Sequence, residues 1–261
     1  MSQTLLHIKS IGPISAPEIV MIHGWGMNSA VFTPLHSSLS QYRVHYVDLP
    51  GFGNSTAIDG EIDNWLEALI KVLPESAIWV GWSLGGLVAT LAATQYPQKI
   101  KGLITIASSP CFMAREEEKW PGIPPQVLAQ FGQSLHKDLS KTVERFLAIQ
   151  AMGSATAKED IKQLRSLVLA KPLPNSNALL QGLKMLEEVD LRPKLNQIEM
   201  PWLRIWGRLD SLVPRHVPAL MPKNVELYQD VILNKASHAP FISHTDEFLD
   251  EFVTWIEKVT N

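Results

Sequence analysis

Cysteine is almost absent from this chain of 261 residues, which contains only Cys111. A single cysteine cannot form an internal disulfide and excludes a metal site built from several thiolates, so we interpret Cys111 as a small packed residue. No apolar run approaches the roughly 20 residues of a membrane span, and the N-terminus lacks the basic and apolar regions of a signal peptide. These absences predict a protein of the reducing cytoplasm that does not bind a membrane.

The chain also lacks an excess of charge of either sign. Its formal net charge is −3, which gives no reason to expect binding to nucleic acid or to a membrane surface. The histidines show no spacing typical of metal ligands, and no H-E-x-x-H motif occurs, so no metal site is predicted. Hydrophobic residues make up 46% of the chain, enough for a sizeable core. At this length we expect one large α/β domain with an insertion.

The stretch from Gly81 to Gly85 reads Gly-Trp-Ser-Leu-Gly and carries the strongest signal in the sequence. An apolar run rich in β-formers, 77–80, precedes it, and a helix of small residues is predicted over 85–95. This is the G-x-S-x-G pattern in its required context, with a strand before and a helix after. It predicts a tight, strained turn that lifts the hydroxyl of Ser83 clear of the sheet, above a helix N-terminus that favours developing negative charge. We therefore interpret Ser83 as a nucleophile.

Other apolar runs predict the remaining strands of a mostly parallel central sheet flanked by helices. The run 19–22 is continuously apolar, as expected of a central strand that is buried on both faces. A helix over 28–39 can be capped by Asn28, and further helices are predicted over 61–72 and 245–259. Besides the strand before Ser83, the predicted strands cover residues 5–9, 18–23, 42–48, 101–107, 202–207 and 225–230.

From residue 112 to 187 the sequence shows a helical pattern and no convincing strand. An apolar stripe predicts one helix that begins at Pro124 and Pro125, continues to Leu147 and is ended by Gly153. Two further helices are predicted over 156–169 and 177–188. We therefore expect an α/β core, 1–111 and 188–261, and a helical cap, 112–187, over the active-site edge of the sheet. Inserted segments at that edge usually carry function, and a helical subdomain without a part in binding is the alternative.

A serine nucleophile needs a base, because its hydroxyl is barely ionised at neutral pH. His238 can take the proton, and a carboxylate must then fix the histidine tautomer and stabilise the imidazolium. Asp210, just beyond the strand 202–207, is the candidate for this carboxylate, whereas Asp48 also follows a strand but is assigned a structural role. Ser83, Asp210 and His238 each come after a predicted strand, so they should converge at one edge of the sheet.

A glycine-rich turn, His23-Gly24-Trp25-Gly26, follows the central strand 19–22. Such a turn brings backbone N–H groups to the edge at which open α/β folds bind ligands. We interpret it as half of an oxyanion hole, with the N–H of Trp25 as a donor and His23 in a supporting role. A plain tight turn is the alternative interpretation.

Several of these motifs occur together in known proteins. The chain resembles the α/β-hydrolase superfamily over its full length. More closely, it is similar to the esterases that act on the methyl ester of pimeloyl-[acyl-carrier protein] in bacterial biotin synthesis. The matching stretches are 23–26 (HGWG), 47–53 (VDLPGFG), 79–88 (WVGWSLGGLV), 107–112 (ASSPCF), 142–148 (TVERFLA) and 238–244 (HAPFISH).

The resemblance implies a carboxylesterase with an acyl-enzyme intermediate that releases methanol and pimeloyl-[acyl-carrier protein]. The residues it implies are Ser83, Asp210 and His238 as the catalytic triad, the N–H groups of Trp25 and Leu84 as the oxyanion hole, and Trp82 and Phe146 as walls of the acyl pocket. Its partner would be the acyl-carrier protein that bears the pimeloyl methyl ester. Neither a metal nor an organic cofactor is needed. Small soluble esters should be hydrolysed in vitro, and we expect a monomer.

Positive charge on the predicted cap indicates where an acidic carrier protein could dock. Two sets of basic residues recur at helical spacing, and each set should share one helix face. The sets are Lys137, Lys141 and Arg145, and Lys158, Lys162 and Arg165. From them we predict a docking surface of Lys141, Arg145, Lys158 and Lys162. The resembled family carries arginine at several of these positions, and lysine keeps the charge but loses the bidentate fork. Two ordinary solvated helix faces are the alternative.

Other functions remain open for the same fold. A general short-chain carboxylesterase, a lactonase or a C–C bond hydrolase would use the same triad, and cofactor-free haloperoxidase activity could be a side reaction. Dehalogenases and epoxide hydrolases are disfavoured because they carry an aspartate in place of Ser83. A hydrolase-like binding protein without activity is disfavoured because no member of the triad is missing.

Overall fold

Seven strands form one sheet in the computed structural model of the protein, which describes residues 6–223 and 228–260. The strands are β1 (Ile8–Ile11), β2 (Glu18–Ile22), β3 (Arg43–Val47), β4 (Ala77–Trp82), β5 (Ile100–Ile106), β6 (Trp202–Gly207) and β7 (Tyr228–Leu233). Their order is β1-β3-β2-β4-β5-β6-β7, and only the pair of β1 and β3 is antiparallel among the described strands. The predicted mostly parallel α/β sheet is confirmed.

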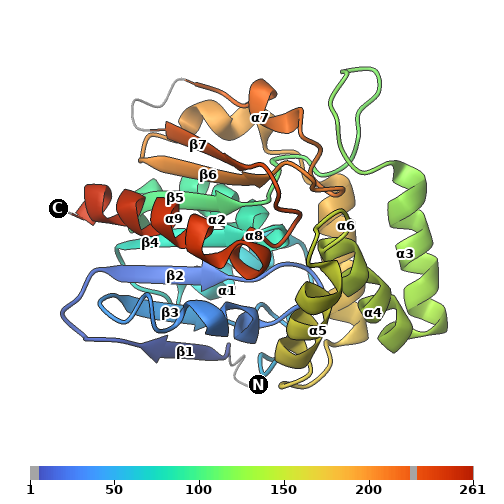
Figure 1. The fold of residues 1–261 in the computed structure, drawn as a ribbon, viewed down its shortest axis with the longest axis horizontal. Helices are drawn as coiled ribbons and strands as arrows, with labels where there is room; N and C mark the ends of the chain where they lie inside the picture. The colour runs from blue at the N-terminus through green and yellow to red at the C-terminus, as the bar shows by residue number, and fades with distance from the viewer. Residues whose placement is uncertain (1–5, 224–227, 261) are drawn as a thin grey trace.

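The central strands are buried on both faces. Every residue of β4 and β6 is buried. This explains why β4 appears in the sequence as a continuous apolar run, whereas β6 contains Arg204, whose buried charge is paired with Asp230 at 2.7 Å. Figure 1 shows α9 in front of the sheet and α2 behind it. The helices of the core are η1 (Ser29–Leu35), α1 (Ile62–Ile70), α2 (Leu84–Gln95), η2 (Pro97–Lys99), η3 (Arg192–Gln197), α7 (Val217–Leu220), α8 (Pro240–Ser243) and α9 (Thr245–Thr260).

Four α-helices lie between β5 and β6. They are α3 (Pro125–Lys137), α4 (Leu139–Gln150), α5 (Ala157–Val168) and α6 (Ser176–Glu188). Figure 1 shows them gathered at the end of the sheet toward which the arrow of β2 points. Because β2 to β7 are parallel, this is the edge at which open α/β sheets bind ligands. The division into a core and a cap at residues 112 and 187 stays a prediction.

The predicted single helix from Pro125 to Leu147 is wrong, because the chain turns at Asp138. The backbone of Asp138 is extended, with φ −158° and ψ 97°, and its side chain accepts a hydrogen bond from the N–H of Lys141 at 3.0 Å. Asp138 is therefore the N-cap of a separate helix, α4. The apolar spacing continues across this break, because Leu135, Leu139 and Val143 recur every four residues, and for that reason the sequence pattern does not reveal it.

The helix predicted over 28–39 is also shorter and tighter in the structure. Asn28 is the N-cap, and its side chain accepts from the N–H of Ala30, as expected, but a 3-10 helix follows and ends at Leu35. Pro34 lies inside this segment and has no backbone N–H to give, so it cannot complete an α-helical hydrogen bond.

The two edge strands differ from their predictions in position. The first was predicted over 5–9 and covers Ile8–Ile11, and Leu5 lies outside the described residues. The last was predicted over 225–230; residues 225–227 lie outside the described residues, and β7 begins at Tyr228. Within the described ranges, none of the helices is long and apolar enough to cross a membrane.

Candidate active site

Ser83 lies in the sharp turn between β4 and α2. Its φ of 55° and ψ of −120° place it in a region that residues other than glycine rarely adopt. Glycines make this turn possible: a β-carbon on Gly81 would overlap with the carbonyl group of Gly85, and one on Gly85 would overlap with the carbonyl oxygen of Ile22. The structure therefore has the strained strand–turn–helix geometry that the sequence predicts for Ser83.

Neighbouring strands hold the backbone of Ser83 in place. Its N–H donates to the carbonyl oxygen of Ile106 in β5 at 3.0 Å, and the hydroxyl of Ser108 donates to its carbonyl oxygen at 2.8 Å. The glycine-rich turn after β2 runs directly past it, because a β-carbon on Gly24 would lie 3.1 Å from the β-carbon of Ser83. The elbow and the glycine-rich turn thus meet at one place.

Asp210 and His238 come together beyond the ends of β6 and β7. The Nδ1 atom of His238 lies 2.7 Å from Oδ2 of Asp210, and both side chains are buried. The other carboxylate oxygen of Asp210 accepts from the N–H groups of Leu212 at 2.8 Å and Val213 at 3.0 Å. A carboxylate beside Nδ1 keeps the proton of a neutral imidazole on that atom. The Nε2 atom of His238 is therefore an acceptor, and it is buried without a partner among the described residues.

Trp82, next to Ser83, holds the loop that carries His238. Its indole N–H donates to the carbonyl oxygen of His238 at 2.7 Å, and its ring packs against the rings of His238 at 5.8 Å and Phe241 at 5.0 Å between centroids. These contacts fix the imidazole relative to the elbow. The predicted role of Trp82 as a wall of the acyl pocket stays a prediction.

His23 supports the glycine-rich turn through a defined tautomer. Its Nε2 accepts from the N–H of Leu49 at 3.0 Å, so the proton is on Nδ1, which donates to the carbonyl oxygen of Gly24 at 2.8 Å. Burial lowers the pKa of His23 to about 4, although Asp48 nearby acts in the opposite direction. The ring is therefore neutral at pH 7 and keeps the peptide between Gly24 and Trp25 in one orientation.

Two backbone N–H groups at this place are free to bind a ligand. Among residues 6–223 and 228–260, no hydrogen-bond partner is found for the N–H groups of Trp25 and Leu84. Leu84 is the first residue of α2, and the first N–H groups of a helix have no partner within it. The geometry is compatible with the predicted oxyanion hole.

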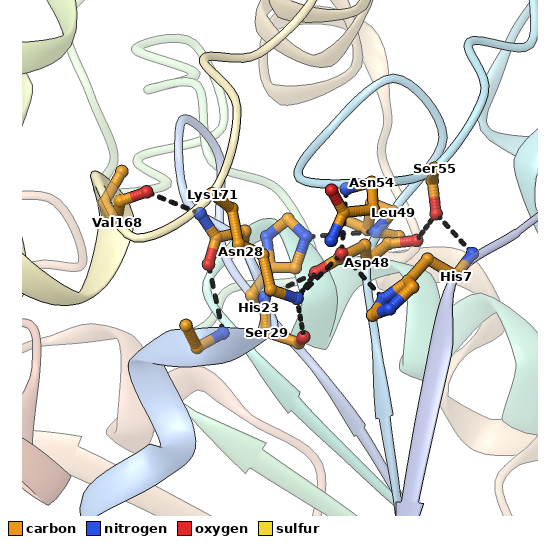
Figure 2. A network of polar contacts seen from close by, with 11 residues as sticks. His7, His23, Asn28, Ser29, Asp48, Leu49, Asn54, Ser55, Val168 and Lys171 are labelled. Carbon is orange, nitrogen blue, oxygen red and sulfur yellow. Dashed lines mark hydrogen bonds and ion pairs between the residues drawn. The ribbon is translucent and has the colours of Figure 1, made fainter.

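Asp48 lies at the centre of a buried polar network (Figure 2) and is not the carboxylate that contacts His238. Its carboxylate accepts from the N–H groups of Ser29 at 2.8 Å and Asn54 at 3.0 Å. Lys171, from the segment between α5 and α6, contacts both carboxylate oxygens at 2.9 and 2.8 Å. This agrees with the structural role predicted for Asp48. The ion pair ties the chain between two inserted helices to the core, and removal of either partner would leave a buried charge unpaired.

Further contacts tie the inserted helices to the residues around Ser83. The side-chain amide of Asn28 donates to the carbonyl oxygen of Val168 at the end of α5, at 2.9 Å (Figure 2). The indole N–H of Trp25 donates to the carbonyl oxygen of Leu179 in α6, at 2.8 Å. A β-carbon on Gly182 would lie only 2.8 Å from the Trp25 ring, so α6 packs directly on it.

Aromatic side chains from the inserted helices pack against Trp25. The ring of Phe146 in α4 lies edge-on to Trp25, with 4.6 Å between centroids, and 5.7 Å from the ring of Phe131 in α3. Only 3% of Ser83 is exposed. Phe146 therefore lies beside Trp25, which is compatible with the acyl-pocket role predicted for it.

The basic residues on the inserted helices are arranged differently from the prediction. Lys137 ends α3 and Asp138 turns the chain, so the expected common face of Lys137 with Lys141 and Arg145 is wrong. Lys141 instead pairs with Asp138 at 3.4 Å. Lys141 and Arg145 remain together on α4, and both are exposed.

The second basic set lies on one helix, as predicted. Lys158, Lys162 and Arg165 are exposed on α5. Arg165 forms an ion pair with Glu144 of α4 at 2.7 Å, so the two helices that carry the predicted docking residues are joined by a surface contact. The docking role itself stays a prediction.

The remaining reactive side chains do not form a second site with metal-ligand character. Cys111 is buried, its thiol donates to the carbonyl oxygen of Met113 at 3.4 Å, and burial raises its pKa, as expected of a packed residue. Within the described part of the chain, no group of three or more His, Cys, Asp or Glu residues is placed to hold a metal ion.

Sequence reasoning missed residues whose partners are far away in the chain. Lys171 contacts Asp48 across 123 positions, and Ser108 contacts Ser83 across 25. Neither Lys171 nor Ser108 lies in a sequence motif that identifies the residue it contacts. The only available signals were that Ser108 follows a buried strand and that Asp48 needs a cation if it is buried.

Comparisons with known proteins agree with this geometry. A family model described as alpha/beta hydrolase fold matches residues 17–245. The pimeloyl-[acyl-carrier protein] methyl ester esterase of Shewanella woodyi is 66% identical over 253 residues, which cover 97% of this chain and 98% of that protein. The protein of the same name from Aeromonas hydrophila is 53% identical and covers 90% of this chain and 93% of its own length.

Among solved structures, the esterase EaEST from Exiguobacterium antarcticum has a TM-score of 0.86 and 21% identity, over 97% of this chain and 96% of its own. This likeness supports the fold. The matches to the two relatives extend over nearly the whole chain. The chain therefore belongs to the α/β-hydrolase family, and within it to the group that contains these pimeloyl-[acyl-carrier protein] methyl ester esterases.

Proposed function

We propose that this chain hydrolyses the methyl ester of pimeloyl-[acyl-carrier protein], giving methanol and the free pimeloyl carboxylate on its carrier, as a step of biotin synthesis. The chain is a carboxylic ester hydrolase of the α/β-hydrolase family. The observation that carries the proposal is the buried pair of Asp210 and His238, which leaves Nε2 of His238 free as a base. The names of the relatives supply the substrate.

In the first half of the reaction, the hydroxyl of Ser83 attacks the carbonyl carbon of the ester while Nε2 of His238 takes its proton. Asp210 keeps the other ring nitrogen protonated and stabilises the imidazolium. The N–H groups of Trp25 and Leu84 bind the oxyanion, and loss of one such donor typically costs about 3 kcal/mol of barrier. When the intermediate collapses, methanol leaves with the proton from His238.

In the second half, water attacks the acyl-enzyme and His238 again acts as the base. The pimeloyl chain is apolar, and the rings of Trp25 and Phe146 offer an apolar surface beside the elbow. We assign Trp82 and Phe146 to the wall of the acyl pocket. No step of this sequence calls for a cofactor.

The substrate assignment can be tested by complementation. A biotin auxotroph that lacks this esterase should grow without biotin when it expresses the wild-type chain, and should fail to grow with Ser83→Ala. The purified protein should release methanol from the carrier-bound methyl ester. The substrate assignment would be contradicted if the protein hydrolysed small esters or lactones but neither released methanol from the carrier-bound ester nor restored growth. The assignment to the esterases would then still stand.

We further propose that helices α3 to α6 act as the cap, and that exposed cations of α4 and α5 receive the acidic carrier protein. The docking residues are Lys141, Arg145, Lys158 and Lys162, all of which are exposed. Support comes from their place over the sheet edge that carries Ser83 and from the chemistry of an acidic partner. Charges at the rim of an interface act mainly on the rate of encounter and are screened by salt.

Charge reversal of these four residues to glutamate should lower kcat/KM for the carrier-bound ester by about tenfold or more, because attraction becomes repulsion. High salt should weaken the wild type on the same substrate. Hydrolysis of p-nitrophenyl butyrate should change little, since it needs only the pocket and Ser83. A matched control is Lys101→Glu with Lys258→Glu, which reverses exposed charges on the core. Equal losses on both substrates, or no loss on either, would contradict the docking surface.

A further inference from the structure

The hydroxyl of Ser108 is hydrogen-bonded to the peptide group that contains one of the two predicted oxyanion donors. It donates to the carbonyl oxygen of Ser83 at 2.8 Å, and only 4% of Ser108 is exposed. That carbonyl and the N–H of Leu84 belong to the same peptide. Because a trans peptide is planar, its N–H points away from its C=O. A donor that fixes the carbonyl oxygen of Ser83 therefore also fixes the direction of the N–H of Leu84.

The other predicted oxyanion donor has the same arrangement. The N–H of Trp25 shares a peptide with the carbonyl of Gly24, and Nδ1 of His23 donates to that carbonyl oxygen at 2.8 Å. His23 and Ser108 are both buried. Each of the two predicted oxyanion donors thus lies in a peptide whose carbonyl oxygen is held by a buried side chain. The shared arrangement connects Ser108 with the oxyanion hole.

The backbone before Ser108 is strained where it directs this hydroxyl toward the elbow. Ala107 has a φ of 43°, in the left-handed region that residues other than glycine rarely adopt. Its N–H donates to the carbonyl oxygen of Ile205 in β6 at 2.8 Å, which holds it in this conformation. A β-carbon on Gly86 would overlap with Oγ of Ser108, so the hydroxyl lies against the first turn of α2. Strained backbone of this kind clusters at functional sites.

The hydroxyl of Ser108 adds to two hydrogen bonds that α2 itself provides. The carbonyl oxygen of Ser83 also accepts from the N–H groups of Gly86 at 2.9 Å and Leu87 at 3.2 Å. Those two donors belong to the helix, whereas Ser108 ties the same peptide to the end of β5. Hydrogen bonds in a buried chain polarise one another, so a donor on the C=O of a peptide makes its N–H a stronger donor. Ser108 therefore both orients and strengthens the N–H of Leu84.

We propose that Ser108 is a positioning residue of the oxyanion hole. Its hydroxyl orients and polarises the peptide that carries the N–H of Leu84, as His23 does for the peptide of Trp25. The inference rests on the proposed acyl-enzyme mechanism, in which negative charge develops on the ester oxygen. Ser108 acts through the N–H of Leu84 and does not touch the substrate. Its removal should therefore lower kcat, because the charge develops only in the reaction, and should leave binding of the uncharged ester unchanged.

The first test is Ser108→Ala, which removes the hydroxyl and keeps the β-carbon. The kcat for p-nitrophenyl butyrate should fall by about tenfold, the effect of losing one hydrogen bond, while KM stays within about twofold. The matched control is Ser109→Ala, because Ser109 is equally buried and its hydroxyl bonds instead to the carbonyl oxygen of Cys111 at 2.7 Å. Its kcat should equal that of the wild type.

A trifluoromethyl ketone separates this role from general damage to the elbow. Oγ of Ser83 adds to the ketone carbon, its proton passes to Nε2 of His238, and the ketone oxygen becomes an alkoxide in the oxyanion hole. Fluorine NMR over a range of pH gives the midpoint at which that oxygen ionises. In Ser108→Ala the midpoint should rise by about one pH unit, because a weaker donor stabilises the alkoxide less. In Ser109→Ala it should not move.

Ser108→Cys decides the test if Ser108→Ala does not fold, because a thiol fills the space of the hydroxyl but is a weak donor. It should raise the same midpoint. A midpoint that stays in place would overturn the role of Ser108, whether or not kcat falls, and so would a kcat equal to that of the wild type. Failure of the proposed function looks different: the wild type would form no adduct with the ketone, and Ser83→Ala would keep its activity.

Discussion

Replacement of Ser83 by alanine is expected to lower hydrolysis of p-nitrophenyl butyrate by at least ~10⁴-fold, because no acyl-enzyme can then form. The fold should be retained, since the Ser83 contacts seen in the structure use its backbone N–H and carbonyl oxygen rather than its hydroxyl. Members of a triad act as a unit, so the double variant of Ser83→Ala with His238→Ala should be little worse than either single variant. Steady-state rates of the three variants give the measurement.

Covalent labelling tests the role of Ser83 as a nucleophile without a measurement of turnover. A serine-directed phosphonate should modify the wild type at Ser83 alone and should leave Ser83→Ala unlabelled. Ser109→Ala is the matched control, because Ser109 is equally buried and its hydroxyl bonds to the carbonyl oxygen of Cys111. That variant should keep both labelling and hydrolysis. Full activity in Ser83→Ala would end the serine-esterase interpretation.

The elbow could be predicted from sequence because its determinants are local. The apolar run, Gly81, Gly85 and the small residues that follow are contiguous in the sequence, and Gly81 is needed because Gly85 lies against it. The close approach of Gly85 to the backbone of Ile22 is the one contact here that is distant in the chain. The buried strand β4 was predictable for the same reason, since a strand buried on both faces appears as a continuous apolar run. The order of the strands in the sheet was not predicted, because it depends on contacts between distant segments.

The missed helix boundary shows the limit of periodicity. Leu135, Leu139 and Val143 keep a four-residue spacing across Asp138, so the stripe looks continuous although the backbone at Asp138 is extended. Apolar spacing reports which side chains face the core, and two helices that both pack on that core can continue one stripe. The local signal that could have shown the break was the residue type at position 138, because aspartate commonly caps helices. In the structure the side chain of Asp138 accepts from the N–H of Lys141.

Around the site, the contact between Asp210 and His238 followed from chain order, since both come after parallel strands that share one edge. Two contacts did not follow from any pattern: that of Lys171 with Asp48, and that of the N–H of His238 with the carbonyl oxygen of Gln150. Lys171 meets Asp48 only because the chain between α5 and α6 is folded back onto the core. Gln150 ends an amphipathic helix, where a polar residue is ordinary, and only the structure shows that it is buried.

Asp210→Asn is expected to lower kcat by roughly 10⁴-fold while leaving the protein folded. One carboxylate oxygen of Asp210 accepts from the N–H groups of Leu212 and Val213, and the oxygen of asparagine can keep both bonds. Its NH2 group must then face Nδ1 of His238, where two donors would oppose each other. The imidazole avoids this by moving its proton to Nε2, and a protonated Nε2 cannot take the proton of Ser83.

Stability and tautomer measurements separate this mechanism from simple damage to the loop. The melting temperature of Asp210→Asn should stay near that of the wild type, whereas Asp210→Ala loses both N–H contacts and should melt lower. Nitrogen NMR should show the proton of His238 on Nδ1 in the wild type and on Nε2 in Asp210→Asn. Because the change is one of proton position and not of packing, the labelling of Ser83 should fall together with turnover. A variant within tenfold of the wild-type rate would rule out Asp210 as the residue that orients His238.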